Sequence, residues 1–84
     1  MNVRKLQHSD YMDLALSEAR LAFEEGEAPI GCVIVKDGEI ISSARNTRET
    51  KNDALGHAEI NAIRSACEKL STWRLSGCTL YVTL

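Results

Sequence analysis

The sequence lacks any long apolar run. Its N-terminus, "MNVRKLQHSDYM", has no hydrophobic stretch of the signal-peptide type, and nowhere do the 84 residues approach the roughly 18 apolar residues that a membrane span needs. Repeats, low-complexity tracts and linkers rich in Pro, Gly or Ser are also absent. These absences predict one small soluble domain, residues 1–84, in the cytoplasm.

The net charge is small and the cysteines are few. The net charge of −2 gives no overall sign of nucleic-acid binding, so any contact with RNA would depend on local features. The cysteines Cys32, Cys67 and Cys78 are an odd number at wide spacings, and two of them lie in apolar, strand-like runs. This pattern argues against a disulfide framework and favours reduced thiols.

What the sequence does contain is a clear order of helices and strands, beginning with an amphipathic helix. Ser9 or Asp10 can cap its start and Gly26 is a natural stop. The apolar residues that recur at helical spacing, and so predict its buried face, are Met12, Ala15, Leu16, Ala19, Ala22 and Phe23.

The next stretch, "PIGCVIVKDGEIISSA", predicts a β-hairpin. Asp37 and Gly38 supply the positive φ angles of a tight turn between its strands. The first strand, Ile30 to Val35, is apolar on both faces rather than alternating. It should therefore lie inside a sheet that is covered on both sides.

A polar loop, "RNTRETKNDALG", leads to a second helix and then to a last strand, "CTLYVTL". The apolar residues that keep the period of this helix are Ile60, Ile63, Cys67 and Leu70. A strand–helix–strand crossover makes the second and third strands parallel, whereas the hairpin makes the first two antiparallel. The predicted fold is α/β, with the order helix–strand–strand–helix–strand and a mixed sheet.

This topology brings four segments to one edge of the sheet. They are the start of the first strand, the end of the second strand, the start of the second helix and the end of the chain. Their residues are Glu27, Ala28, Pro29, Arg45, Asn46, His57, Glu59 and Leu84. Open α/β sheets bind ligands at the carboxyl ends of parallel strands, so this edge is the candidate site.

His57 and Glu59 carry the chemistry of the stretch "GHAEINAIRSAC". A neutral imidazole can bind a metal and a carboxylate can move protons. Positions two apart on a regular helix face different ways, so the pair can act together only at the start of the helix. Taken alone, such a pair is more typical of surface or capping residues.

A zinc site needs four ligands, or three and a water, and the other candidates do not complete one. Cys32 and Cys78 belong to strands and should pack in the core. Cys67 lies about two and a half turns along the helix from His57, and His8 falls in an N-terminal stretch that is expected to fray.

The chain resembles the zinc-dependent cytidine and adenosine deaminases, and most closely the branch that acts on adenosine in tRNA. The resemblance runs through "EGEAPIGCVIV", Asn46, "HAEINAI" and "LSGCTLYVTL", in this order. It implies a cytidine-deaminase-like, three-layer α/β/α fold. It also implies a zinc-dependent enzyme that converts adenosine in tRNA to inosine, with a homodimer as the functional form.

The resemblance also implies roles for individual residues. His57 corresponds to a zinc ligand, and Glu59 to the group that carries protons from the attacking water to the base and the leaving ammonia. Asn46 corresponds to a residue that hydrogen-bonds the ribose or base. Ala28 and Pro29 correspond to the backbone wall of the base pocket.

In family members "TLYVTL" is followed by Glu-Pro-Cys-x-x-Cys, whose cysteines complete the zinc site, and the present sequence ends just before that point. We therefore expect an N-terminal part of a deaminase domain, with an incomplete zinc site and little stability alone. Two alternatives to a tRNA adenosine deaminase stay open. One is a deaminase of a free cytosine or guanine base, nucleoside or nucleotide, and the other is a non-catalytic fragment.

Simpler interpretations of the remaining site residues also stay open. Asn46 can be an ordinary turn residue, and Pro29 can simply start a strand. The basic side chains Arg45, Arg48 and Lys51 could contact a phosphate backbone, but a short charged loop is usually just solvated.

Overall fold

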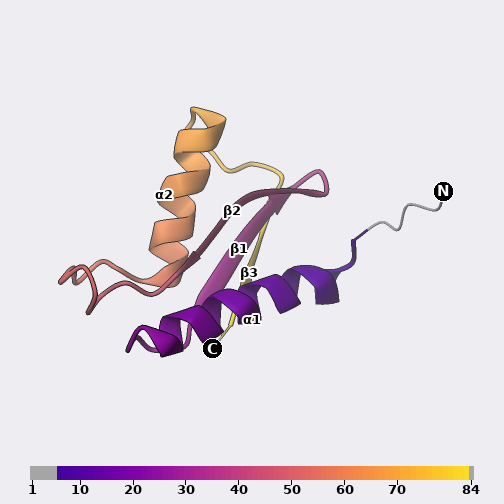
Figure 1. Ribbon diagram of the computed structural model, residues 1–84. Helices are drawn as coiled ribbons and strands as arrows, with labels where there is room; N and C mark the ends of the chain where they lie inside the picture. The colour runs from indigo at the N-terminus through magenta and orange to yellow at the C-terminus, as the bar shows by residue number, and fades with distance from the viewer. Residues whose placement is uncertain (1–5, 84) are drawn as a thin grey trace.

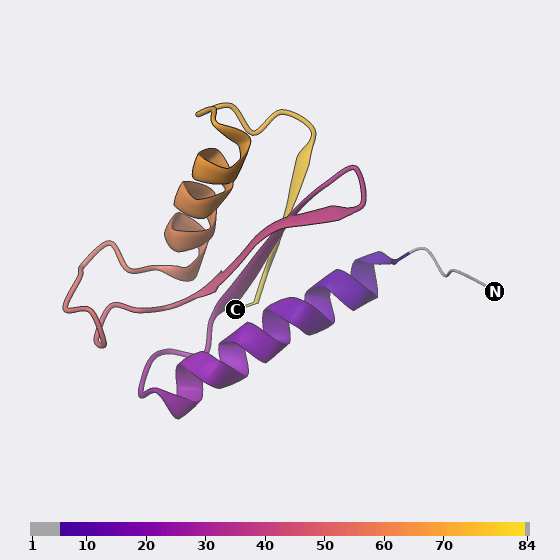
Figure 2. The ribbon, with the colours of Figure 1, turned by 45° about the horizontal axis from the view of Figure 1, so that its top comes forward.

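A computed structural model describes residues 6–83 of the chain (Figure 1). Its elements, in order, are α1 (His8–Glu24), β1 (Gly31–Lys36), β2 (Glu39–Arg45), α2 (Ala58–Leu70) and β3 (Cys78–Val82). The two helices lie on opposite faces of the sheet, as Figures 1 and 2 both show. The predicted order of elements and the three-layer α/β/α arrangement are therefore confirmed. No helix in residues 6–83 is long and apolar enough to cross a membrane.

The strand order is β2-β1-β3, with β1 in the centre. β1 pairs antiparallel with β2 and also antiparallel with β3. The prediction of a mixed sheet is therefore wrong for the pairing: β2 and β3 run in the same direction, but β1 lies between them. Residues Gly31 to Val35 of β1 are all buried, which confirms the expected cover on both faces.

The hairpin turn forms where it was predicted. Asp37 and Gly38 have φ angles of 52° and 76°, as a two-residue turn of this hand requires. The register shifts between Ile34 and Val35, which marks a β-bulge near the turn.

α1 packs through small residues rather than through its largest apolar ones. Its buried residues are Tyr11, Ala15, Ala19 and Ala22. Leu16 and Phe23, which were expected to be buried, are 52% and 69% exposed. The cause is the close approach of the helix to β1: a Cβ on Gly31 would lie 2.0 Å from the carbonyl oxygen of Ala15.

The start of α1 also differs from the prediction. Gln7 is the N-cap, so Ser9 and Asp10 lie inside the first turn. The Asp10 carboxylate accepts a hydrogen bond of 2.7 Å from the Gln7 amide. Asp10 thus stabilises the start of the helix from the third helical position, as in a capping box.

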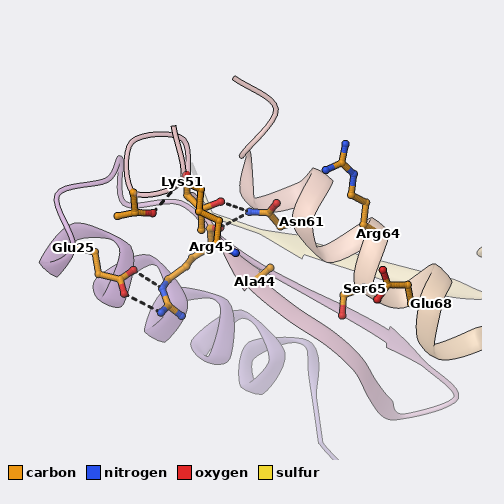
Figure 3. A pocket seen from close by; sticks show the side chains of 10 residues that line it. Glu25, Ala44, Arg45, Lys51, Asn61, Arg64, Ser65 and Glu68 are labelled. Atoms are coloured by element: carbon orange, nitrogen blue, oxygen red, sulfur yellow. Dashed lines mark hydrogen bonds and ion pairs between the residues drawn. The ribbon is translucent and has the colours of Figure 1, made fainter. Parts of the chain in front are cut away.

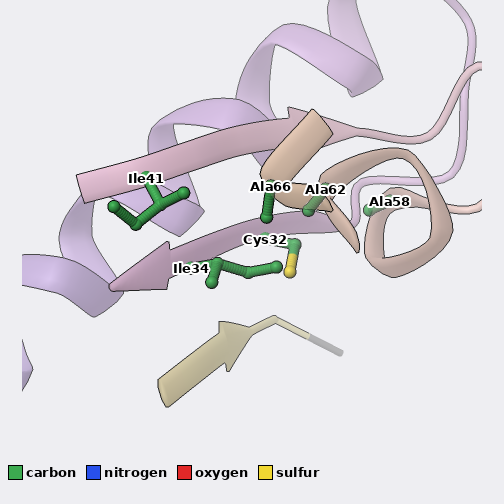
Figure 4. Close-up of a cluster of buried hydrophobic side chains, with 6 residues drawn as sticks. All are labelled: Cys32, Ile34, Ile41, Ala58, Ala62 and Ala66. Atoms are coloured by element: carbon green, nitrogen blue, oxygen red, sulfur yellow. The ribbon is translucent and has the colours of Figure 1, made fainter. Parts of the chain in front are cut away.

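α2 follows the same principle on the other face. Ala58, Ala62 and Ala66 are fully buried against Cys32, Ile34 and Ile41 (Figure 4). Ile63, which was expected to face the sheet, is 39% exposed. Single methyl groups let the helix axis come close to the strands, so the start of α2 is placed firmly against the sheet.

Candidate functional site

Hydrogen bonds join the segments that were predicted to converge. The Asn46 amide donates to the Ile30 carbonyl at 3.2 Å, which extends the β1–β2 ladder by one residue. The Ala58 amide donates to Asn46 Oδ1 at 2.8 Å. The approach to β1, the end of β2 and the start of α2 therefore meet at one end of the sheet.

The end of β3 reaches the same place. The Thr83 amide donates to the Gly31 carbonyl at 3.0 Å, and the Gly31 amide donates to Thr83 Oγ1 at 2.9 Å. Leu84, also predicted at this edge, lies outside the described residues. The predicted convergence is thus confirmed for the part of it that the structure describes.

Asn46 holds the start of α2 with one end of its side chain only. The residue is 3% exposed. The atom facing the Ala58 amide must be the oxygen, because only an acceptor can meet an N–H there. Nδ2 makes no hydrogen bond with any residue from 6 to 83. This N–H donor, next to the start of α2, is therefore available to a ligand.

His57 and Glu59 lie on either side of the first residue of α2. His57 is the N-cap residue, with extended φ and ψ of −78° and 145°, and Glu59 is in the first turn. Both are half-buried. The His57 side chain makes no capping hydrogen bond, since Asn46 caps the Ala58 amide instead. Its imidazole is therefore not needed to cap the helix.

The carboxylate of Glu59 lies close enough to β1 to affect Cys32. Burial, together with the negative charge of Glu59, raises the pKa of the Cys32 thiol to about 11. Cys32 is fully buried and stays protonated at neutral pH. Cys32 is a core residue, as expected, and Glu59 of α2 is near enough for its charge to act on it.

Ala28 and Pro29 form an exposed rim next to these groups. The Ile30 amide donates to the Ala28 carbonyl at 2.8 Å, which closes a tight turn around Pro29. Because the Ile30 carbonyl accepts from Asn46, this turn lies directly beside Asn46. Pro29 precedes β1 by two positions and does not start the strand.

The described residues do not make a metal site by themselves. In residues 6–83 no group of three or more His, Cys, Asp or Glu side chains could hold a metal ion. The three cysteines are free, and Cys32 lies in the core. His8 is not frayed as expected: it is the first residue of α1, and its Nδ1 hydrogen-bonds the Tyr81 hydroxyl. His57 is thus one possible metal ligand, and the described residues supply no set of further ligands around it.

The basic residues near the site divide into two kinds. Arg45 pairs with Glu25 at 2.8 Å and with Glu18 at 3.1 Å. The hydrogen bond from Arg45 lowers the pKa of the Glu25 carboxyl. Arg45 therefore ties the end of β2 to α1, whereas Arg48 and Lys51 are exposed in the loop.

A pocket of about 470 Å³ lies beside the candidate site, at the outer edge of β2 (Figure 3). Asn61, Ser65 and Glu68 of α2 line it. An α-helix turns about 100° per residue, so this face and Glu59 lie on opposite sides of the alanine stripe. The pocket is therefore separate from the Asn46–His57–Glu59 group.

Asn61 is a supporting residue that sequence reasoning missed. Its Nδ2 donates to the Arg45 carbonyl and to Thr47 Oγ1, both at 2.9 Å (Figure 3). It holds the residues on both sides of Asn46, Arg45 through its backbone carbonyl and Thr47 through its side-chain hydroxyl. The signal in the sequence is its position four residues after His57, one helical turn further on.

Residues 6–84 match the family model of the MafB19-like deaminases. The tRNA-specific adenosine deaminase of Aquifex aeolicus (strain VF5) is 54% identical over 74 residues, which are 88% of this chain and 49% of that protein. The protein of the same name from Bacillus subtilis (strain 168) is 55% identical over 88% of this chain and 46% of its own length.

Two solved structures have the same fold. A structure from a study of A-to-I editing by tRNA:A34 deaminases at the wobble position of transfer RNA has a TM-score of 0.89 and 49% identity, covering 93% of this chain and 60% of that one. The guanine deaminase of Bacillus subtilis has a TM-score of 0.88 and 40% identity, covering 92% and 50%. These matches confirm the predicted cytidine-deaminase-like fold.

The chain spans about half the length of the curated relatives it matches. The family model covers all but its first five residues. The chain belongs to the MafB19-like deaminase family.

Proposed function

We propose that the protein containing this chain deaminates adenosine to inosine in tRNA. The similarity to proteins named tRNA-specific adenosine deaminase supports the substrate. The observation that carries the proposal is the position of Asn46, whose oxygen holds the start of α2 while its Nδ2 stays open beside His57 and Glu59.

In this reaction Glu59 moves protons. Water adds to the purine carbon that bears the amino group, the C–N bond breaks, and ammonia leaves. The Glu59 carboxylate accepts a proton from the water and returns protons to the ring nitrogen and the departing amine. Its half-buried place in the first turn of α2 suits this role.

Asn46 and the 28–29 turn would bind the substrate. Nδ2 of Asn46 is a donor for a ribose or base oxygen, and its direction is set because Oδ1 is engaged. Ala28 and Pro29 are exposed next to Asn46 and would form one wall of the base pocket.

We propose His57 as one ligand of a zinc ion. A bound zinc ion would make water a stronger nucleophile at neutral pH. The other ligands would come from outside residues 6–83, since that part of the chain contains no cluster of three ligating side chains. On this proposal the 84 residues are an N-terminal part of the domain and by themselves do not catalyse deamination.

A second candidate is a deaminase of a free base such as guanine, or of a cytosine base or nucleoside. The similarity to guanine deaminase, 40% identical with a TM-score of 0.88, favours it. We further propose a cytoplasmic homodimer. The free thiols and the family resemblance are consistent with that assembly and location.

The role of Glu59 can be tested in the whole natural protein that contains this chain. Glu59→Gln should lower kcat by about 10²- to 10⁴-fold while zinc content stays the same, because only the proton shuttle is lost. Glu68→Gln, an exposed change on the same helix, is the matched control. Inosine formation and metal content are measured, and a fully active Glu59→Gln variant would contradict the proposed role.

The substrate is tested by ammonia release from an adenosine-bearing anticodon stem-loop, free guanine and free cytidine. The proposal expects a higher kcat/KM on the stem-loop. A preference for guanine would instead support the second candidate, and no release from any of them would support a non-catalytic protein.

A further inference from the structure

Glu27 is a buried carboxylate between α1 and β1. The residue is 5% exposed, and its own amide donates to the Ala22 carbonyl at 2.9 Å, which fixes it to the end of α1. Its Oε2 accepts from the Thr50 amide at 2.6 Å, and its Oε1 accepts from the Glu49 amide at 3.2 Å. A carboxylate is rarely buried to this extent without such partners.

The two amides keep Glu27 ionised. Burial by itself raises the pKa of this carboxyl, but the hydrogen bonds from Thr50 and Glu49 outweigh that effect, and the pKa is lower than usual. The negative charge of Glu27 therefore faces two backbone N–H groups at neutral pH, and charge-assisted bonds of this kind are stronger than neutral ones.

The loop that Glu27 holds is compact and closed at its base. The Thr47 amide donates to the Gly56 carbonyl at 2.8 Å, and the Lys51 amide donates to the Thr47 carbonyl at 3.0 Å. A Cβ on Gly56 would lie 2.8 Å from the Arg48 nitrogen. The loop therefore has little free space where its two ends meet.

Those ends are Asn46 and His57. We propose that Glu27 is a positioning residue: by binding the Glu49 and Thr50 amides, it holds the loop so that Asn46 and His57 keep their spacing beside the 28–29 turn. The inference rests on the proposed function, because it gives Glu27 a role in binding the substrate of that site.

The placement of Glu27 argues for more than a general contribution to stability. It is adjacent in sequence to Ala28, in the proposed wall of the base pocket, and its side chain reaches the loop that follows Asn46. Together with the Asn46–Ile30 bond, it therefore links the two walls of the proposed base pocket. Loss of the link should change substrate affinity before it changes the core.

The first part of the test is amide hydrogen exchange on Glu27→Ala and Glu27→Gln, with the exposed Glu24→Gln as the control. In Glu27→Ala the Glu49 and Thr50 amides should exchange at least about tenfold faster, while β1 amides stay within about twofold. Glu27→Gln keeps one acceptor oxygen and should have a smaller effect. Unchanged exchange at Glu49 and Thr50 in Glu27→Ala would overturn the proposal, whatever the protein's activity.

The second part is steady-state deamination by the natural protein, with the anticodon stem-loop as substrate. Glu27→Ala should raise KM about tenfold with kcat changed less than about threefold, and Glu27→Gln should fall between Glu27→Ala and the parent. Faster loop exchange with unchanged KM, or a fall in kcat that only follows the folded fraction, would overturn the positioning role. If the parent does not deaminate the stem-loop, guanine or cytidine, the proposed function fails and the positioning role fails with it. An active parent with unaffected variants defeats the role of Glu27 alone.

Discussion

The two ends of the sheet are built differently. At the site end, buried polar groups and close backbone approaches hold the segments together: Asn46 caps α2, Glu27 binds the loop, and Gly31 lies against α1. Toward the hairpin end, the Tyr11 hydroxyl donates to the Gly38 carbonyl at 3.0 Å, and the Tyr11 ring lies 5.3 Å from the ring of Tyr81 at an interplanar angle of 35°.

The difference concerns how sharply each end defines positions. Hydrogen bonds between buried groups tolerate little displacement of the atoms that form them, and so do close backbone contacts at a glycine. Breaking either kind of contact costs free energy. Aromatic packing is less directional, and a Cβ on Gly38 would have no atom within 4 Å. Atomic positions are therefore most tightly constrained at the end of the sheet where the candidate site lies. Substitutions at the two ends should differ in their effects on stability.

The largest difference should appear between two glycines. Gly31→Ala puts a methyl group 2.0 Å from the Ala15 carbonyl oxygen, so we expect it to lower the free energy of unfolding by at least about 3 kcal/mol. Gly38→Ala meets only the strain of its φ of 76°, about 1 kcal/mol. Urea denaturation of both variants in the natural protein gives the comparison, and equal losses would show that the two ends are equally tolerant.

Asn46 gives the next largest effect. Asn46→Ala leaves the Ala58 amide without its acceptor and should cost about 2 kcal/mol. Asn46→Asp keeps the acceptor oxygen, so it should retain most of the stability while losing the Nδ2 donor and with it much of the substrate affinity. The exposed Asn52→Gly, at a φ of 48°, should change stability by less than about 0.5 kcal/mol. Thermal melts and KM measurements separate these effects, and equal KM values for Asn46→Asp and the parent would argue against substrate binding by Nδ2.

Tyr11→Phe should lower the free energy of unfolding less than Asn46→Ala does. It removes the hydrogen bond to Gly38 and keeps the ring, so we expect a loss of about 1 kcal/mol and no change in KM. Chemical denaturation and steady-state kinetics test both expectations. A raised KM would mean that the hairpin end and the site end are coupled.

The order of elements was predictable because its signals are local. The Asp37-Gly38 turn, the apolar run of β1 and the polar stretch before α2 each indicate one element without help from the rest of the chain. The convergence of Asn46 and His57 followed from that order. Their roles remain predictions, because residues 6–83 contain no group of three or more His, Cys, Asp or Glu side chains that could hold a metal ion.

The errors have physical causes. Hydrophobic periodicity gives more weight to Leu16, Phe23 and Ile63 than to alanines, although the alanines make the closest contacts with the sheet. The sequence of β3 does not show whether this strand pairs with β1 or with β2, because its pattern of apolar and polar residues would be the same beside either strand. The partners of Glu27 are backbone amides 22 and 23 residues away, which no side-chain pattern reveals.

The hydrogen bond between Asn46 and the start of α2 limits how this site can be redesigned. A library that varies position 46 would lose most members to instability, since few side chains offer an oxygen to the Ala58 amide at that distance. Ala28 and Pro29 are exposed at the same rim, and Ala28 joins the local network through its backbone carbonyl. Diversity introduced there should be tolerated, so the route to a changed substrate range runs through the 28–29 turn, with Asn46 left unchanged.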